Sequence, residues 1–246
     1  LRMKGIILAA GKGTRLYPMT KPVCKPLLPV YDKPLIYYSI AVLMEADIRD
    51  IMIIIPPEEE QTFRKLLGDG SAFGVQITYA VQYVARGIAD AFLVAEDFVQ
   101  GDCACLILGD NIFYAKDLRE KLMQAASNPN GATVFGYYVD DPRAFGVVEF
   151  DENGTAISLE EKPKHPKSNY IIPGLYFYDA EVLALAKTLQ PSARGELEIT
   201  DLNRLYLESG KLQVIPLESD FVWMDAGTAD SLLESAQTIK QIQDDT

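Results

Sequence analysis

The sequence holds too few cysteines and histidines for a disulfide framework or a zinc centre. Its 246 residues include three cysteines and one histidine, His165. An odd number of cysteines without a secretory signal argues against a disulfide framework. Cys103 and Cys105 with a single histidine leave too few ligands for zinc, so we expect both cysteines in the core. Lys25 beside Cys24 favours some thiolate character at that cysteine.

Long apolar runs and an excess of positive charge are also missing. No run reaches the roughly 18 apolar residues that a membrane span needs, and the first run, Gly5 to Ala10, is too short for a signal peptide. The net charge of −12 argues against binding to nucleic acid or to an anionic membrane surface. We therefore expect a folded cytoplasmic protein without a nucleic-acid or membrane partner.

Acidic residues are missing from the first 31 residues of this otherwise acidic chain. Six basic side chains precede the first carboxylate, that of Asp32. Such a local excess indicates a small polyanion bound at one place, although a solvated charged loop would give the same count. The six basic residues are Arg2, Lys4, Lys12, Arg15, Lys21 and Lys25.

Apolar, β-branched runs alternate with helical patterns in the first half of the chain. This alternation predicts an α/β fold, with a Rossmann-like, mostly parallel sheet flanked by helices. From Ala132 the pattern becomes strand-rich, and no composition break divides residues 3–246, so we expect one domain. Strands are expected at 4–9, 50–55, 76–79, 103–108, 133–139, 146–150, 155–159, 174–178 and 212–216 and near Trp223. Helices are expected at 35–47, 58–67, 87–99, 118–126, 180–189, 198–208 and 228–243.

A glycine-rich loop follows the first expected strand, at the position where parallel sheets bind their ligands. Glycine lets backbone N–H groups approach phosphate oxygens closely. The stretch Gly11-Lys12-Gly13-Thr14 does not fit a Walker loop, and Leu16 replaces the third glycine of a dinucleotide fingerprint, which argues against a dehydrogenase. Gly-x-Gly alone is more often an ordinary tight turn than a phosphate site. Arg15 and Lys25 close by suit phosphate oxygens and favour the phosphate interpretation.

A longer pattern extends this loop. The run G-x-G-T-R-L-x-P-x-T followed by K-P-L-L-P-V, residues 11–30, resembles the signature of the sugar-1-phosphate nucleotidyltransferases. Seven further motifs, in the order and spacing of that family, extend the resemblance over essentially the whole chain. They are LILGDNIF (106–113), FGVVE (145–149), EEKP (160–163), KSNY (167–170), GLYFYD (174–179), PSARGELEITD (191–201) and WMDAGT (223–228).

The resemblance implies a fold, a reaction and partners. The fold is that of the nucleotide-diphospho-sugar transferases, with a strand-rich sugar-binding insertion. The reaction is Mg²⁺-dependent transfer of a thymidylyl group from dTTP to α-D-glucose 1-phosphate, giving dTDP-glucose and pyrophosphate for dTDP-rhamnose and polysaccharide synthesis. A uridylyltransferase that uses UTP and a non-catalytic sugar-nucleotide sensor are the alternatives. The resemblance also implies a homo-oligomer, a mainly nucleotide-binding part at 3–130, a mainly sugar-phosphate-binding part at 131–227 and a C-terminal helix at 228–246.

The resemblance further assigns roles to the residues at matching positions. The glycine loop wraps the triphosphate, Asp110 and Asp225 hold Mg²⁺, and Arg15 assists the departure of pyrophosphate. Arg15, Lys25, Asp110 and Lys162 are the implied catalytic residues. The implied nucleotide-binding residues are Leu8, Ala10, Gly11, Gly13, Thr14, Arg15, Lys25, Gln82, Gly87 and Asp110. The implied sugar-phosphate-binding residues are Gly146, Glu161, Lys162, Ile172, Gly174 and Arg194.

The chain departs from the family pattern mainly on the nucleotide side. Ala10 replaces a usual glycine, and Pro26 and Asp90 each stand where glutamine is common. Tyr83 and Arg86 also differ from the usual residues. These differences bear on the preference for base and ribose. On the sugar side the departures are Phe145, Ile172 and Pro173.

Overall fold

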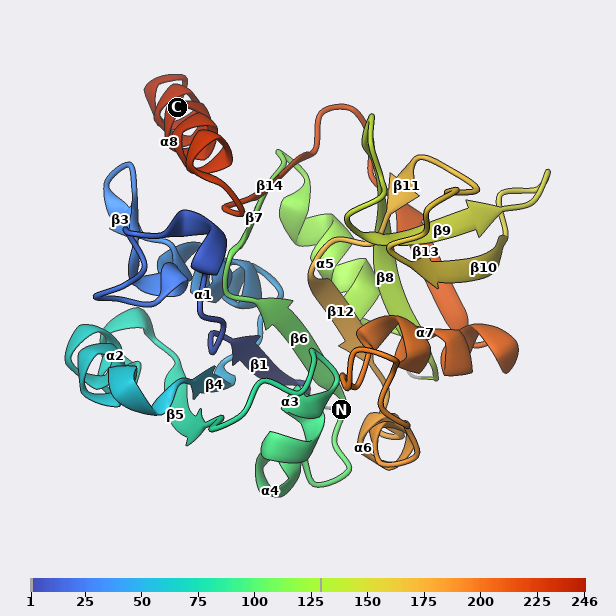
Figure 1. Cartoon of the computed structure of the whole chain (residues 1–246), viewed down its shortest axis with the longest axis horizontal. Helices are drawn as coiled ribbons and strands as arrows, with labels where there is room; N and C mark the ends of the chain where they lie inside the picture. The colour runs from blue at the N-terminus through green and yellow to red at the C-terminus, as the bar shows by residue number, and fades with distance from the viewer. Residues whose placement is uncertain (1, 129) are drawn as a thin grey trace.

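A ten-stranded mixed sheet forms the centre of the computed structural model, which describes residues 2–128 and 130–246 (Figure 1). Its strands are β1 (Lys4–Leu8), β4 (Asp50–Ile55), β5 (Gln76–Val81), β6 (Ala104–Leu108), β8 (Ala132–Tyr138), β9 (Gly146–Phe150), β10 (Ala156–Glu161), β11 (Tyr170–Ile171), β12 (Leu175–Tyr178) and β13 (Leu212–Pro216). The strand order is β10-β9-β11-β8-β12-β6-β1-β4-β5, and β13 pairs with β8 off this path. The predicted mixed α/β sheet is confirmed.

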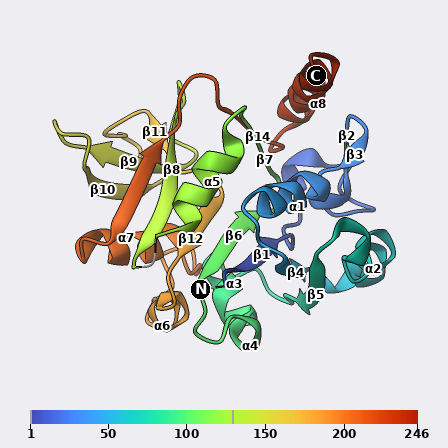
Figure 2. The ribbon, with the colours of Figure 1, turned by 180° about the vertical axis from the view of Figure 1, so that it is seen from behind.

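Helices cover both faces of the sheet. They are α1 (Ile36–Glu45), α2 (Glu60–Leu67), α3 (Asp90–Val94), α4 (Glu96–Val99), α5 (Leu118–Ala126), α6 (Val182–Ala186), α7 (Ile199–Glu208) and α8 (Ala229–Asp244). In Figure 2, α1 and α5 lie in front of the sheet, whereas Figure 1 shows α3, α6 and α7 over the other face. No helix within residues 2–128 and 130–246 combines the length and the apolar character that a membrane crossing needs.

Alternate side chains of the central strands enter two separate cores. Ile7 and Ile53 belong to the core on the α1 and α5 face, while Ile6 and Ile54 belong to the core under α3, α6 and α7. All four are fully buried. Strands buried on both faces lack the polar alternation of a half-exposed strand, which explains the continuous apolar runs in the sequence.

The parallel half of the sheet places two loops side by side. β6 and β4 flank β1, and all three run in the same direction. Their carboxyl ends therefore meet at one edge, where ligands bind in open α/β sheets. The Gly109 N–H donates to the Leu8 carbonyl at 2.9 Å, which joins the loop after β1 to the loop after β6. The glycine-rich loop thus lies next to Asp110.

The second half of the chain extends the sheet with antiparallel strands. β12 lies between β6 and β8 and runs antiparallel to both, with Leu175 opposite Ile107 and Tyr176 opposite Val134. β9, β10 and β11 continue the sheet beyond β8 (Figure 1). The predicted strand-rich region is confirmed, and it brings the later motifs to the edge that carries Asp110.

Two small sheets connect the C-terminal helix to the body of the protein. β7 (Asn111–Tyr114) pairs with β14 (Val222–Asp225), and β2 (Pro29–Val30) pairs with β3 (Lys33–Pro34). α8 begins with a capping box in which Thr228 and Ser231 bond each other's backbone N–H groups. Its buried Ile239 belongs to a third apolar cluster with Val30 and Leu35. The predicted last helix is confirmed.

The structure departs from the expected elements between residues 87 and 99 and at β7. The expected helix 87–99 is wrong in its first turn, because α3 begins at Asp90 and Gly87 has a φ of 99° that no helix accommodates. The helix also breaks at Ala95, which separates α3 from α4. β7 was not expected, since its partner β14 lies more than a hundred residues away in the chain and leaves no local signal.

Candidate active site

The glycine-rich loop is shaped by Gly13. Its φ of 62° lies in the left-handed region, and a Cβ there would be 3.1 Å from Thr20 Cγ2 and 3.3 Å from Lys25 Cβ. The Thr20 hydroxyl donates to the Gly13 carbonyl at 2.5 Å and closes the turn. Gly11 faces open space, with no heavy atom within 4 Å of a Cβ placed there. Its backbone is therefore accessible to a ligand, and Thr14 and Arg15 follow in an exposed 3₁₀ turn (Thr14–Leu16).

Lys25 connects this loop to Asp110. Lys25 is only 9 % exposed, and its Nζ lies 2.8 Å from Asp110 Oδ2 in an ion pair. A cavity of about 200 Å³ lies between the loop and this pair. The lining residues include four that the sequence assigned to the nucleotide besides Asp110, namely Leu8, Gly11, Gly13 and Lys25.

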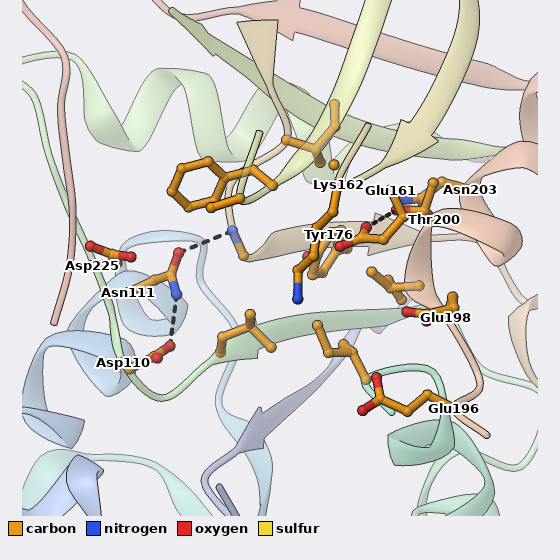
Figure 3. Close-up of a pocket in the computed structure, with 18 of the residues that line it drawn as sticks. Asp110, Asn111, Glu161, Lys162, Tyr176, Glu196, Glu198, Thr200, Asn203 and Asp225 are labelled. Atoms are coloured by element: carbon orange, nitrogen blue, oxygen red, sulfur yellow. Dashed lines mark hydrogen bonds between the residues drawn. The ribbon is translucent and has the colours of Figure 1, made fainter. Parts of the chain in front are cut away.

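Asn111 fixes the position of Asp110, a role that the motifs did not indicate. It is 4 % exposed, and its Nδ2 donates to Asp110 Oδ1 at 2.8 Å. Figure 3 shows this bond. The Oδ1 atom of Asn111 accepts hydrogen bonds from the Gly174 N–H at 3.1 Å and from Trp223 Nε1 at 2.7 Å. One amide therefore joins the carboxylate after β6 to the beginning of β12 and to β14. Its place directly after Asp110, within the motif at 106–113, is the feature of the sequence that could have indicated this role.

Asp225 lies close to Asp110, as the β7–β14 pairing requires. In that pairing Asp225 is opposite Asn111, and the Ala226 N–H donates to the Asp110 carbonyl at 3.3 Å. Burial raises the pKa of the Asp225 carboxyl, and the negative charge of Asp110 raises it further, against the opposing effect of Lys25 and Arg15. Two neighbouring carboxylates therefore repel each other, and a bound cation would relieve the repulsion.

The donor set at Asp110 and Asp225 fits Mg²⁺. Mg²⁺ prefers carboxylate oxygens, keeps several waters, and needs only one or two protein ligands beside substrate phosphates. Within residues 2–128 and 130–246, no three or more His, Cys, Asp or Glu side chains form a metal-binding group. A closed all-protein cage of the zinc or calcium kind is therefore not formed by these residues.

A second cavity, of about 340 Å³, lies next to the first. The two cavities share Ile88, Leu108 and Asp110 in their walls. All six residues assigned to the sugar phosphate line the second cavity together with Arg15 and Asp225; these six are Gly146, Glu161, Lys162, Ile172, Gly174 and Arg194. Residues from distant parts of the sequence thus surround two neighbouring cavities with Asp110 in the wall of both.

Glu161 and Lys162 are held in this cavity by different means. The Thr200 hydroxyl donates to Glu161 Oε2 at 2.6 Å, which fixes the carboxylate (Figure 3). A Cβ at Gly146 would come within 3.1 Å of Thr200 Oγ1, so glycine keeps this wall open. Lys162 has a φ of 45°, unusual for a residue with a side chain, and its N–H donates to the Phe145 carbonyl at 3.0 Å. Such backbone strain is typical of functional sites.

Arg194 borders the cavity, and its guanidinium already forms ion pairs with two carboxylates. Its guanidinium lies 2.8 Å from Glu198 and 3.1 Å from Glu196. Hydrogen bonding to Glu198 raises the pKa of Arg194 above its usual value. A phosphate group would have to compete with these two carboxylates, and phosphate binding by Arg194 stays a prediction.

Gln82 and Gly87 lie on the nucleotide side, in the segment that leads from β5 to α3. Gln82 lines a third cavity, of about 330 Å³, which it shares with Ala10 and Gly11. Gln82 Nε2 donates to Asp90 Oδ2 at 3.0 Å. Gly87 is packed against the backbone of Leu197, where a Cβ would be 2.4 Å from the carbonyl oxygen, so this position accepts glycine alone. Nothing in the sequence predicted the contact of Asp90 with Gln82, except that aspartate stands where glutamine is common.

Cys24 borders the third cavity, whereas Cys103 and Cys105 line none of the three cavities. The expectation of thiolate character at Cys24 is wrong: burial, assisted by the nearby negative charge of Glu59, raises the pKa of the thiol to about 12. Cys103 and Cys105 are buried, 5 % and 0 % exposed. Their expected place in the core is confirmed.

A glycine-rich loop beside Asp110 and Asp225, with a polar cavity next to both, suits the transfer of a nucleotidyl group. The chain matches the model of the family described as nucleotidyl transferase over residues 4–242. This chain therefore belongs to the nucleotidyl transferase family.

Relatives and solved structures agree with this assignment. The chain is 57 % identical to glucose-1-phosphate thymidylyltransferase of Neisseria gonorrhoeae, over 98 % of this chain and 84 % of the relative. It is 52 % identical to the enzyme of the same name from Mycolicibacterium smegmatis, over 98 % of this chain and 83 % of the relative. A crystal structure from Bacillus anthracis, assigned as a glucose-1-phosphate thymidylyltransferase and holding a sucrose, superposes with a TM-score of 0.89 at 47 % identity, covering 96 % of this chain and 94 % of that one. UDP-glucose pyrophosphorylase, at 23 % identity and a TM-score of 0.82, shares the fold.

Proposed function

We propose that this nucleotidyltransferase transfers a thymidylyl group from dTTP to α-D-glucose 1-phosphate, forming dTDP-glucose and pyrophosphate. The observation that carries the proposal is that two neighbouring cavities share Asp110 in their walls. One is walled by the glycine-rich loop, and the other by residues suited to a sugar phosphate. The names of relatives at 47 to 57 % identity support the same two substrates.

The reaction joins two anions, so positioning and charge neutralisation are what the protein must supply. In the proposed reaction a phosphate oxygen of glucose 1-phosphate attacks the α-phosphorus of dTTP, and the bond to pyrophosphate breaks. Lys162, whose amine points into the sugar-side cavity (Figure 3), holds the attacking phosphate. Arg15 lines the same cavity and neutralises charge on the departing pyrophosphate.

Asp110 and Asp225 are the proposed ligands of Mg²⁺. When bound, Mg²⁺ supplies the positive charge that brings the two phosphate groups together. Lys25, 2.8 Å from Asp110, adds a fixed positive charge on the nucleotide side. Glu161, held by Thr200, accepts hydrogen bonds from sugar hydroxyls. Gly174 lets Leu108 and Asn111 pack closely in the cavity wall, since a Cβ there would be 2.7 Å from Leu108 Cγ and 2.9 Å from Asn111 Oδ1.

UTP is the alternative to dTTP as the nucleotide substrate. The Gln82 amide can pair with the imide edge that thymine and uracil share, since that edge has a donor and acceptors. The decisive experiment measures pyrophosphate release with glucose 1-phosphate and each of dTTP, UTP, CTP, GTP and ATP. Turnover with dTTP above the others is expected; turnover with UTP but none with dTTP would refute the assignment of dTTP.

A non-catalytic sensor is the second alternative, and the two carboxylates speak against it. A binding protein does not need the Asp110–Asp225 pair that the fold assembles from separate strands. Asp110→Asn is expected to lower turnover by about a hundredfold or more, since a metal ligand and the partner of Lys25 both change. Unchanged pyrophosphate release in the folded variant would remove Asp110 from the metal site.

The cellular setting follows from the motif resemblance and is also a proposal. We propose a cytoplasmic homo-oligomer that supplies dTDP-glucose for dTDP-rhamnose and surface polysaccharide. Light scattering of the purified chain tests the oligomeric part, and a monomer across micromolar concentrations would contradict it.

A further inference from the structure

Asp90 is a buried carboxylate that faces the amide of Gln82. Asp90 is 5 % exposed, and its Oδ2 accepts a hydrogen bond from Gln82 Nε2 at 3.0 Å. An ionised carboxylate accepts hydrogen bonds and donates none, whereas an amide has a donor end and an acceptor end. The pairing therefore determines which end of the amide turns toward Asp90, and Gln82 Oε1 is left for another partner.

The backbone holds both residues in place. Gln82 follows β5 directly, and its N–H donates to the Ile55 carbonyl at 2.9 Å. Asp90 opens α3, and its N–H donates to the Gly87 carbonyl at 3.3 Å. Gly87 in turn is packed so closely on Leu197 that no side chain fits there. The orientation of the amide is thus set before any ligand binds.

Gln82 borders the third cavity, which also has Ala10 and Gly11 in its wall and shares Gly11 with the first cavity. Resting on the proposed function, we propose that Asp90 is a positioning residue that turns Gln82 Oε1 toward the base and so selects bases with an imide N–H. Thymine and uracil carry a hydrogen on N3 that Oε1 accepts. Cytosine has a lone pair at N3, which Oε1 repels, so Asp90 excludes dCTP through Gln82.

Asp90→Asn tests this directly because its shape is almost unchanged. An asparagine can accept from Gln82 Nε2 or donate to Gln82 Oε1, so the Gln82 amide becomes free to turn over and donate to cytosine N3. The ratio of kcat/KM for dTTP to that for dCTP is expected to fall about tenfold or more, the effect of one correctly directed hydrogen bond. Asp90→Glu keeps an acceptor-only group and is expected to restore most of the ratio.

Three further measurements keep the test specific. Asp97→Asn removes one exposed charge from α4 and is expected to leave the ratio unchanged. In a Gln82→Ala background, adding Asp90→Asn is expected to change the ratio no further, because Asp90 acts through Gln82. Asp90→Ser, whose hydroxyl also donates and accepts, gives the same test if Asp90→Asn does not fold.

An unchanged ratio in folded Asp90→Asn would overturn the inference, because the carboxylate would then only stabilise the start of α3. An equal fall of the ratio in the Gln82→Ala background would overturn it as well. These results differ from failure of the proposed function: wild-type protein without turnover on dTTP or UTP would refute that function, and this inference with it.

Discussion

Truncation of Asn111 to alanine tests the connection between fold and site. The substitution removes the acceptor of the Gly174 N–H and of Trp223 Nε1–H, and the donor to Asp110. A buried donor without an acceptor costs about 1–3 kcal/mol. Trp223 is half-buried and water replaces part of its bond, so the free energy of unfolding should fall by about 2–4 kcal/mol. For a chain of this size, the melting temperature should fall by about 5–15 °C.

Asn111→Ala is also expected to lower turnover by about 10- to 100-fold, the effect of losing an outer partner of a metal ligand. Urea denaturation gives the free energy of unfolding, and pyrophosphate release at saturating substrates gives turnover. Asn153→Ala, in an exposed turn, is the control and should change neither. A loss below about 0.5 kcal/mol for Asn111→Ala, which is the range of ordinary surface substitutions, would refute the reasoning about the buried donors.

Three further predictions follow from the site and its surroundings. Because the pKa of Asp225 is raised, the folded state favours its protonated form, so metal-free protein should lose stability as the pH rises above 3.8, the ordinary value. Asp225→Asn should remove this loss, giving a metal-free protein that is more stable than wild type at pH 7 in urea but has little turnover; lower stability would contradict the raised pKa. Gly87→Ala should cost about 2–5 kcal/mol through overlap with Leu197 and left-handed strain, whereas Gly154→Ala, with a φ of 78° and open space, should cost only about 1–2 kcal/mol; equal losses in thermal melts would rule out the overlap. The buried thiols, including Cys24 with its pKa of about 12, should react with Ellman's reagent at pH 8 only after unfolding in urea, and rapid reaction of native protein would contradict their burial.

The central part of the fold could be predicted because its signals are local. The run around Ile6 and Ile7 is apolar throughout since both side chains are buried on opposite faces, and the strand follows from that run alone. α8 could likewise be predicted, because Thr228 is a capping residue and the apolar residues after it have helical spacing. β7 depends on a partner strand distant in sequence, so no local pattern indicated it.

The site residues likewise include some that local motifs indicate and others whose partners only the fold brings near. Asp110, Lys162 and Gly174 lie within motifs, and the structure brings all three to one cavity. Asn111 acts through hydrogen bonds to Gly174 and Trp223, and Asp90 through one to Gln82, and only the fold brings these partners near. An asparagine after a strand or an aspartate at a helix start has many ordinary explanations. Thiolate character at Cys24 was wrongly expected from its neighbour Lys25. In the structure Lys25 pairs with Asp110, and the nearby negative charge of Glu59 adds to the effect of burial in raising the pKa of the thiol.

The most direct test of the proposed function is the identity of the product. Purified protein is incubated with dTTP, glucose 1-phosphate and Mg²⁺, and the mixture is followed by ³¹P NMR, with an EDTA-treated sample as control. We expect equal amounts of dTDP-glucose and pyrophosphate in the sample with Mg²⁺ and neither in the control. Release of inorganic phosphate without a sugar nucleotide, or dTDP-glucose formation undiminished by EDTA, would contradict the proposed reaction at Asp110 and Asp225.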